Sequence, residues 1–287
     1  MPERPDLEYA LPILNKSLQS TSIVGVELHK PVILRLALPG TLEEALVGQE
    51  IHGLSRRLHF VCFDFGPKSE IEMIIAPMLA GRLSVHVPKE GNKRDRALSL
   101  ELSDGHVLRY RDSVQMGKVY VIPKGAHELV AGFAAQGLDV LDPKKFTWKK
   151  FLALARKRRD QAKVFLLDKS ALDSLGNAYA DEVLHAAGIH PKTFVRKLSD
   201  VDLKRLHEAI PAVLLAARAE IRKQEPATDE KVRDFLKVRN RHKEPCPSCG
   251  TAIRKAGVHG HDAFFCPACQ PETRKSGIVS WGKKPKA

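Results

Sequence analysis

The sequence predicts an α+β protein of several units: a β-rich N-terminal unit, a helical middle unit and a small metal-binding unit near the C-terminus. Three observations predict this order. Short apolar runs separated by turn residues fill residues 1–135, helical periodicity follows residue 144, and four cysteines gather late in the chain. The chain has 287 residues, which exceeds one average domain and leaves room for a buried core in two.

Residues 1–135 contain the short apolar runs that are typical of strands. Residues 23–28 alternate between apolar and other side chains, as a half-buried strand does. Further runs lie at residues 32–38, 58–65, 72–75 and 107–110. Many short strands separated by turn residues predict a sandwich or a barrel. One stretch differs, because leucines recur at helical spacing over residues 7–18, although Pro12 disfavours a helix there.

A connection follows at residues 136–144, where Asp142-Pro143 is a turn signal. Residues 145–160 then predict a basic amphipathic helix, with apolar positions among many Lys and Arg. Further helices are predicted at residues 163–168, 178–187, 200–223 and 228–238. Residues 281–287 read as a solvated basic tail.

The net charge of the chain is +13 and its pI is about 9.6. This excess of cations favours an anionic polymer or surface as a partner, although a merely basic soluble protein would have the same composition. The sequence contains no run of about 20 apolar residues, and no apolar segment follows its basic start. We therefore expect no membrane association and a cytoplasmic location, at the nucleoid if the source is a bacterium.

Four of the five cysteines form two pairs of the type C-x2-C. Cys246 and Cys249 are separated from Cys266 and Cys269 by sixteen residues, which lies within the zinc-ribbon range. Four thiolates complete a closed tetrahedral site, so the prediction is one structural Zn²⁺ without a catalytic role. Cys62 stands alone in an apolar run and is interpreted as a small core residue.

The loop between the two cysteine pairs is basic. Arg254 and Lys255 lie in it, together with His259 and His261, which would be surplus ligands beside four thiolates. A basic zinc hairpin can offer a rigid loop to DNA, and this is the interpretation preferred for Arg254 and His261. A solvated loop without a partner is the alternative.

Residues 175–191 predict a capped helix. Gly176-Asn177 can begin it, Gly188 ends it, and Pro191 prevents its continuation. Ser199 then precedes the next helix. Two helices joined by tight turns can present backbone N–H groups and Asn177 to a phosphate, although a purely structural hairpin would have a similar sequence.

The chain begins Met1-Pro2-Glu3. Because Pro2 is small, Met1 would normally be removed, which leaves a secondary amine at the N-terminus. An α-amino group has a pKa near 8, so a useful fraction is neutral and nucleophilic at pH 7. Such an amine can attack C1′ of a sugar, displace the base and leave an iminium, with Glu3 as the acid that protonates the ring oxygen.

Three motifs occur together in one order. They are Met1-Pro2-Glu3, Gly176-Asn177-x-Tyr-x-x-Glu182 and a four-cysteine finger ending Cys266-Pro-Ala-Cys-Gln270. In this combination the chain resembles the formamidopyrimidine-DNA glycosylase/endonuclease VIII family over nearly its whole length. The resemblance implies an N-terminal β-sandwich in residues 1–135, a helix–two-turn–helix domain in residues 136–240 and a zinc finger in residues 241–280.

The resemblance also implies an activity and its residues. The family removes a damaged base from DNA and then cuts the strand by β- or β,δ-elimination, which implies damaged duplex DNA as the partner. We expect a monomer, because nothing in the sequence suggests a dimer interface. The matching positions are Pro2 as nucleophile, Glu3 as acid/base and Asn177 as a phosphate contact. Met78 falls near the family's intercalating methionine, and an ordinary core methionine is the alternative.

The sequence departs from the family at three places. His59 and His261 stand where the family usually has a lysine and an arginine that touch phosphates, and Val114-Gln115-Met116 replaces a segment with two arginines. A histidine carries less charge at pH 7 than either cation, which should weaken DNA binding. These departures favour a second hypothesis, a non-catalytic DNA- or RNA-binding protein on the same scaffold. A third hypothesis is an enzyme that keeps the same chemistry but acts on bulky or crosslinked adducts.

Overall fold

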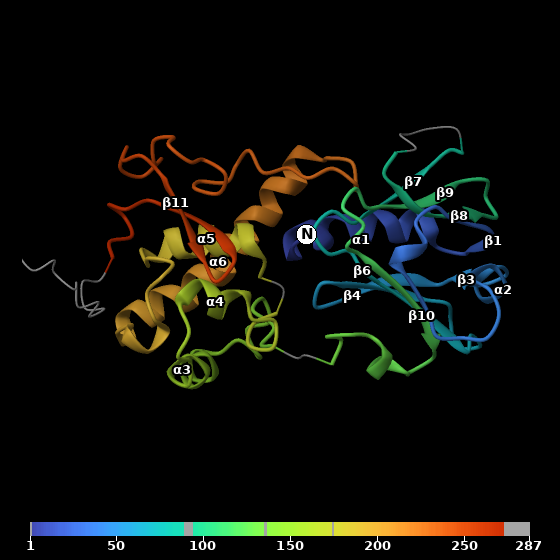
Figure 1. Cartoon of the computed structure of the whole chain (residues 1–287), viewed down its shortest axis with the longest axis horizontal. Coiled ribbons are helices and arrows are strands. Elements are labelled where there is room, and N and C mark those ends of the chain that lie inside the picture. The colour runs from blue at the N-terminus through green and yellow to red at the C-terminus, as the bar shows by residue number, and fades with distance from the viewer. Residues whose placement is uncertain (1, 89–93, 135–136, 174, 273–287) are drawn as a thin grey trace, which may run out of the picture.

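The computed structural model describes residues 2–88, 94–134, 137–173 and 175–272. The predicted basic tail at residues 281–287 lies outside these residues. Strands fill the first part of the chain and helices the second, with a two-stranded hairpin after them (Figure 1). In the described residues, no helix is both long enough and apolar enough to cross a lipid bilayer.

Two five-stranded sheets form the N-terminal part, which confirms the predicted sandwich. The first sheet has the order β3 (Glu50–Ile51), β1 (Thr21–Leu28), β8 (Arg96–Leu102), β9 (Val107–Arg111), β7 (Arg82–His86). The second has the order β2 (Leu34–Leu36), β10 (Lys118–Pro123), β6 (Ile71–Ala76), β5 (Phe60–Asp64), β4 (Gly53–Arg57). All neighbours are antiparallel except β2 and β10.

The central strands of the second sheet are apolar on both faces. Met73 and Ile75 of β6 point into the core between the sheets. Ile74 of the same strand points outward, where Val130 and Phe133 cover it. Because two faces are buried, these strands read as continuous apolar runs rather than as alternating ones. The half-buried Cys62 packs against the outer cluster, and burial raises the pKa of its thiol to about 12.

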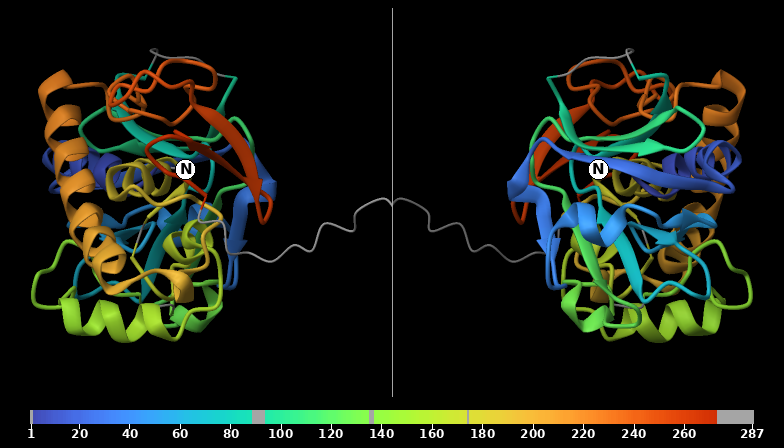
Figure 2. Two further views of the ribbon diagram at one scale, coloured as in Figure 1. Left: turned by 90° about the vertical axis from the view of Figure 1, so that its left-hand side faces the viewer. Right: turned by 90° about the vertical axis from the view of Figure 1, so that its right-hand side faces the viewer.

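Helix α1 (Arg4–Leu18) lies beside the sandwich and packs against the long helix α6 (Asp200–Gln224) of the second part (Figures 1 and 2). Its leucines are buried in the sandwich core, as their spacing predicts. Pro5 lies in the first turn, where a missing N–H costs nothing, and Pro12 is tolerated on the exposed side. α1 therefore joins the two parts of the molecule.

The second part is helical and has its own core. Its helices are α3 (Trp148–Arg156), α4 (Ala162–Leu167), α5 (Asn177–Ala187) and α6. Gly188 ends α5 with a φ of 68°, and Ser199 caps α6 by accepting from the N–H of Asp202, as the sequence predicts. The shorter helices are α2 (Leu42–Leu46), η1 (Pro31–Ile33), η2 (His127–Leu129) and η3 (Val195–Lys197).

Some expected elements differ. The helix predicted over residues 228–238 is wrong, because this segment is irregular and its polar groups bind other elements: Thr228 donates to the carbonyl of Leu83, and two of its N–H groups donate to Glu182. Residues 32–38 form a helical turn followed by the short strand β2, because Pro31 starts the turn. Strands β3, β4, β7, β8 and β10 were not predicted.

Candidate active site and zinc centre

Glu3 connects the two parts of the molecule. Its carboxylate accepts hydrogen bonds from the backbone N–H groups of Gly176 at 3.0 Å, Ala178 at 3.0 Å and Tyr179 at 3.2 Å. These donors surround the start of α5, where N–H groups have no partner within the helix. Because Glu3 is only 4% exposed, the bonds are sheltered from water. The carboxylate thus caps a helix far away in sequence and fixes the N-terminal residues against it.

Gly176 is required by this contact. A Cβ on residue 176 would lie 2.3 Å from Cδ of Glu3, far inside van der Waals contact. The backbone of Gly176 is extended, with a φ of −107°, so space rather than backbone conformation demands glycine here. The Gly-Asn pair in the sequence therefore reflects the approach of the Glu3 side chain.

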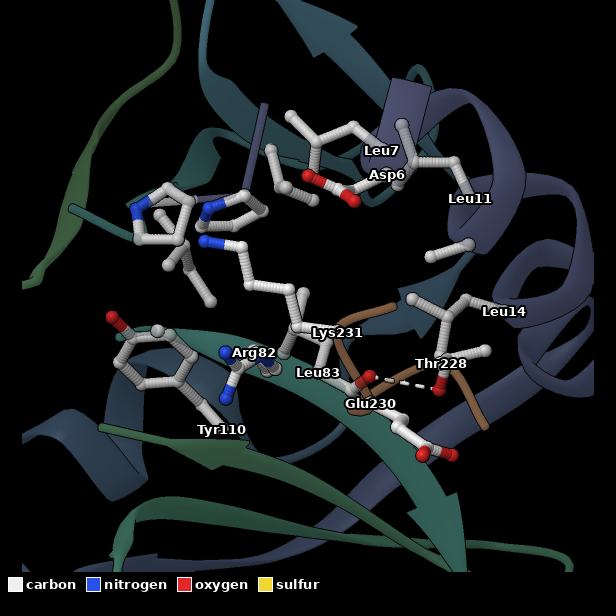
Figure 3. A pocket seen from close by; sticks show the side chains of 16 residues that line it. Asp6, Leu7, Leu11, Leu14, Arg82, Leu83, Tyr110, Thr228, Glu230 and Lys231 are labelled. Atoms are coloured by element: carbon white, nitrogen blue, oxygen red, sulfur yellow. Dashed lines mark hydrogen bonds between the residues drawn. The ribbon is translucent and has the colours of Figure 1, made fainter. Parts of the chain in front are cut away.

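Pro2 is one of the residues that line a pocket between α1, the two sheets and residues 228–231 (Figure 3). Leucines of α1 and Leu83 form apolar walls, and Asp6, Arg82, Tyr110 and Lys231 supply polar groups. Figure 3 shows the Lys231 side chain extending into this space. Burial, together with neighbouring Arg233, lowers the pKa of Lys231. Pro2, the carboxylate of Asp6 and the lysine Lys231 therefore line one partly desolvated pocket.

Charged residues around Glu3 tie the two parts together. Arg4 pairs with Asp139 and lies 3.4 Å from Asp173, and Arg56 pairs with Asp173 at 3.0 Å. Arg4 and Asp173 are buried, so removing one of them would leave a buried charge without its partner. These ion pairs hold the start of α1 and strand β4 against the loop before α5.

His59 is 9% exposed, with its ring centroid 4.1 Å from that of Phe60. Burial, together with the nearby cation Lys169, lowers the pKa of His59 to about 3. The ring is therefore neutral at physiological pH and supplies no positive charge. Lys169 lies near both Glu3 and Asp173, and burial lowers its pKa as well. The sequence analysis placed a phosphate contact at His59, and the cation that lies near this residue is the ammonium of Lys169.

Two loops lie side by side near the pocket, at residues 77–81 and 112–117. The hydroxyl of Tyr110 lies 2.3 Å from the place where a Cβ on Gly81 would be and 1.9 Å from that on Gly117. Met78 is half-buried against the outer cluster of the second sheet, with a φ of 43°. Leu79, Val114 and Met116 are exposed apolar neighbours on these loops.

Asn177 is the first residue of α5, and Gly176 is its N-cap. The side-chain Oδ1 of Asn177 is buried and accepts no hydrogen bond from the described residues. Nearby, the fully buried Lys163 and Asp181 form an ion pair, and Arg239 donates to the other oxygen of Asp181 at 2.9 Å. These charges fix the first turns of α5, and with them the position of Asn177.

Cys246, Cys249, Cys266 and Cys269 converge as predicted. Their sulfur atoms all lie within 4.8 Å of one another. A zinc ion with four bonds of about 2.3 Å to sulfur requires edges of about 3.8 Å between sulfurs. The separations of 3.9 Å between Cys246 and Cys269 and 3.4 Å between Cys249 and Cys266 fit this tetrahedron. The cluster is therefore a site for one structural zinc ion.

Side chains of α5 and the residues after it attach this zinc centre to the helical part. Nε2 of His185 lies 3.4 Å from Sγ of Cys246, within reach of an N–H···S bond. Glu182 accepts three N–H bonds from residues 237–239, just before the finger. The buried Gln270 accepts from Cys266 N–H and donates to the carbonyl of Ile189. α5 thus holds Glu3 at one end and the zinc centre near the other.

Strands β11 (Arg254–Val258) and β12 (His261–Phe265) form the finger hairpin. His259 and Gly260 both have positive φ values, which suits a tight two-residue turn. His261 is exposed beside this turn, whereas Arg254 pairs with Phe265 at the zinc end. The structure therefore brings Pro2 and Glu3 together with Gly176 and Asn177, but separates Arg254 from His261 along the hairpin.

Four residues of this region were not predicted from the sequence to belong to a functional site: Lys169, Asp173, His185 and Lys231. Lys231 was assigned to a helix that does not form, and Asp173 precedes α5 without a motif of its own. His185 shares its helix face with Asp181 and Glu182 and lies 61 residues before Cys246, so no pattern in the sequence links it to the zinc site. The others depend on contacts between residues far apart in sequence.

Comparison with known proteins identifies relatives of the whole chain. Residues 1–119 match the family model "Formamidopyrimidine-DNA glycosylase N-terminal domain", residues 137–226 its H2TH domain, and residues 243–271 "Zinc finger found in FPG and IleRS". Formamidopyrimidine-DNA glycosylase from Symbiobacterium thermophilum is 31% identical, covering 94% of this chain and 90% of its own. The same enzyme from Brevibacillus brevis is 32% identical, covering 94% and 99%.

Solved structures resemble the chain over the same length. A Lactococcus lactis FPG mutant in complex with Fapy-dG containing DNA superposes with a TM-score of 0.82 and 27% identity, covering 94% of this chain and 100% of that one. A complex of Lactococcus lactis Fpg with DNA containing an abasic site superposes with a TM-score of 0.81 and 25% identity over the same shares.

The contact between Gly176 and Glu3 predicts the effect of one methyl group. Gly176→Ala should lower the free energy of unfolding by about 2 kcal/mol, because the new Cβ displaces a buried carboxylate. Gly257→Ala is the matched control, since a Cβ there meets nothing within 4 Å. Urea unfolding of both variants measures the difference, and equal midpoints would contradict the proposed close contact.

The N–H···S bond of His185 predicts slower loss of zinc from the native protein. His185→Phe should weaken zinc retention about tenfold or more, because the thiolate of Cys246 loses a hydrogen-bond donor. Release of zinc to a colorimetric chelator measures this directly. His242→Phe, at an exposed histidine before the finger, is the control. If both variants release zinc at the wild-type rate, His185 does not support the metal site.

The lowered pKa of His59 predicts a pH dependence of stability. Between pH 7 and pH 5 the unfolded chain binds a proton at His59, with a pKa of 6.5, while the folded chain, with a pKa of about 3, does not. Protonation of His59 therefore stabilises the unfolded state alone. As the pH falls from 7 to 5, the free energy of unfolding should decrease by about 2 kcal/mol through this residue. Unfolding of wild type and His59→Gln at both pH values isolates this contribution, and equal losses would refute it.

Proposed function

We infer the function from the premise that this chain belongs to the formamidopyrimidine-DNA glycosylase family. It is a bifunctional DNA glycosylase and AP lyase of base excision repair, which removes a damaged base from DNA and then cleaves the strand. One observation carries the assignment of residues: the carboxylate of Glu3 is bound to the start of α5, and its neighbour Pro2 lines the pocket between the two parts.

Pro2 is the proposed nucleophile once Met1 has been removed. The lone pair of its secondary amine forms a bond to C1′ of the damaged nucleotide, and the bond from C1′ to the base breaks with its electron pair on the leaving base. The attacking nitrogen then loses its proton to the carboxylate of Glu3, the bond between C1′ and O4′ breaks with its electron pair on O4′, and Glu3 passes the proton to O4′, which leaves an iminium between Pro2 and C1′. Loss of a proton from C2′ expels the 3′ phosphate, and water finally releases the sugar and restores the amine.

Glu3 is the proposed acid/base of these steps. Its position next to Pro2 puts a carboxyl group beside the sugar that Pro2 attacks, and its three N–H donors hold that group in one orientation. Because the carboxyl group is already held in one orientation, it can transfer a proton to O4′ without a change of side-chain rotamer. The rigid contact with α5 supports this role.

The proposed DNA contacts lie on several elements. Asn177 at the start of α5 and the exposed Arg254 and His261 of the hairpin are proposed to touch phosphates of damaged duplex DNA. Met78 is proposed to fill the gap left by a flipped nucleotide. His59 keeps a role as a neutral hydrogen-bonding group, while Lys169 supplies the charge near it.

Two broader assignments go with this function. The domain limits at residues 135, 240 and 280 are kept as proposed boundaries of the sandwich, the helical domain and the zinc finger. A protein that repairs chromosomal DNA works where that DNA is, so we place it in the cytoplasm at the nucleoid.

A non-catalytic nucleic-acid-binding protein is the second candidate. The neutral state of His59 favours it, because a customary cation is missing beside the reaction centre. A protein that only binds nucleic acid does not require the secondary amine that Pro2 would supply in the pocket.

Borohydride trapping on DNA with an abasic site separates the two candidates. Borohydride reduces an iminium to a stable crosslink, so the wild-type protein should form a covalent complex. Pro2→Gly should reduce its yield about a hundredfold, because the secondary amine is gone, and leave DNA affinity nearly unchanged. DNA binding without trapping in the wild type would establish the binding protein instead.

A further inference from the structure

The helix α3 carries a positively charged face that the proposed reaction does not use. Exposed cations extend from its N-terminal flank to its C-terminal flank: Lys144, Lys145, Lys149, Lys150, Arg156, Lys157 and Arg159. Only Lys145 and Arg156 of these have a carboxylate within 4.0 Å among the described residues, namely Asp142 and Asp200. The rest of the set adds positive charge that nothing in the described structure neutralises.

The cations on α3 share one side of the helix. At about 100° per residue, Lys149, Lys150, Arg156 and Lys157 fall within an arc of about 120°. Phe151 and Ala155 lie on the opposite side and are fully buried in the helical core. The arrangement is therefore a rigid strip of charge about 12 Å long, and a duplex presents three to four phosphates per strand over that length.

This strip lies away from the site at Pro2. α3 runs along one edge of the molecule, and the zinc hairpin with β11 lies toward the opposite edge in both views (Figures 1 and 2). The N-terminus lies near the centre of the molecule in Figure 1, away from α3. A duplex seated at the pocket and the zinc hairpin would therefore leave the α3 strip for another stretch of nucleic acid.

Other anionic partners fit the strip less well. A helix that binds a membrane surface needs an apolar face to insert, but the large apolar side chains of α3 are buried or half-buried against the helical core. DNA needs only the charge, and the proposed function brings the protein onto DNA. Trp148 and Lys204, whose ammonium lies 5.3 Å from the indole ring, continue the surface toward α6.

We propose that the basic face of α3 is a second DNA-binding surface, which holds a duplex segment outside the damaged site. The identity of this partner rests on the proposed function, while the surface itself rests on the charges above. A second contact of this kind raises affinity for long DNA and lets the protein transfer between neighbouring segments without releasing both.

The test compares two variants with the same net charge. The strip variant carries K149Q, K150Q, K157Q and R159Q, and the control carries K16Q, K68Q, R222Q and K223Q at exposed cations elsewhere. Both are titrated at several salt concentrations with a long undamaged duplex and with a short duplex that holds a central abasic site. Borohydride trapping on the short duplex reports the reaction centre.

We expect the strip variant to bind long DNA about tenfold more weakly than the control at low salt. The slope of log K against log salt should fall by up to about 3.6, since each lost phosphate contact contributes about 0.9. Affinity and trapping on the short duplex should stay within about twofold of wild type.

Three results would overturn the proposal. The first is equal binding of long DNA by the two variants. The second is an equal loss on the short duplex, which would place the strip inside the damage-binding groove. The third is a strip-dependent affinity for phosphatidylserine vesicles with unchanged DNA binding, which would make the face a membrane contact. If the wild type fails to trap while the strip effect persists, only the proposed catalytic function fails.

Discussion

The bond between the Glu3 carboxylate and the start of α5 is the constraint on which the rest of the structure depends. A carboxylate buried at 4% exposure needs donors for its oxygens, and three backbone N–H groups of another domain provide them. The same contact requires glycine at residue 176 and sets the position of Pro2. Under the roles proposed for Pro2 and Glu3, this one interaction fixes both the catalytic geometry and the contact between the domains, so a change that separates the domains would also displace these two residues.

α5 extends this constraint to the zinc centre. Its first turn holds Glu3, and later turns carry Glu182 and His185, which bind the segment before the finger and the thiol of Cys246. Because a helix of eleven residues is stiff, the finger hairpin keeps a fixed position relative to Pro2. The ion pairs of Asp173 with Arg4 and Arg56 add a second tie between the domains. The zinc ion thereby contributes to a site in which it takes no chemical part.

Local signals predicted what depends on neighbours in sequence. The cysteine spacing gave the zinc site, and the residues Gly188 and Ser199 marked helix ends because capping acts within a few residues. The helix predicted at residues 228–238 does not form, because polar groups of this segment make hydrogen bonds to Glu182 and Leu83, which are distant in sequence. The neutral state of His59 and the lowered pKa of Lys231 could not be predicted from the sequence for the same reason, since both result mainly from burial by other elements.

Locating the crosslink by mass spectrometry tests the central claim most directly. After borohydride reduction on abasic DNA, the protein is digested and the modified peptide is sequenced. The account predicts a peptide that begins at Pro2, without Met1, with the reduced sugar on its α-amine. A sugar on the side chain of Lys231 or Lys169 would contradict the account, because the nucleophile would then be a pocket lysine and the contact between Glu3 and α5 would serve assembly alone.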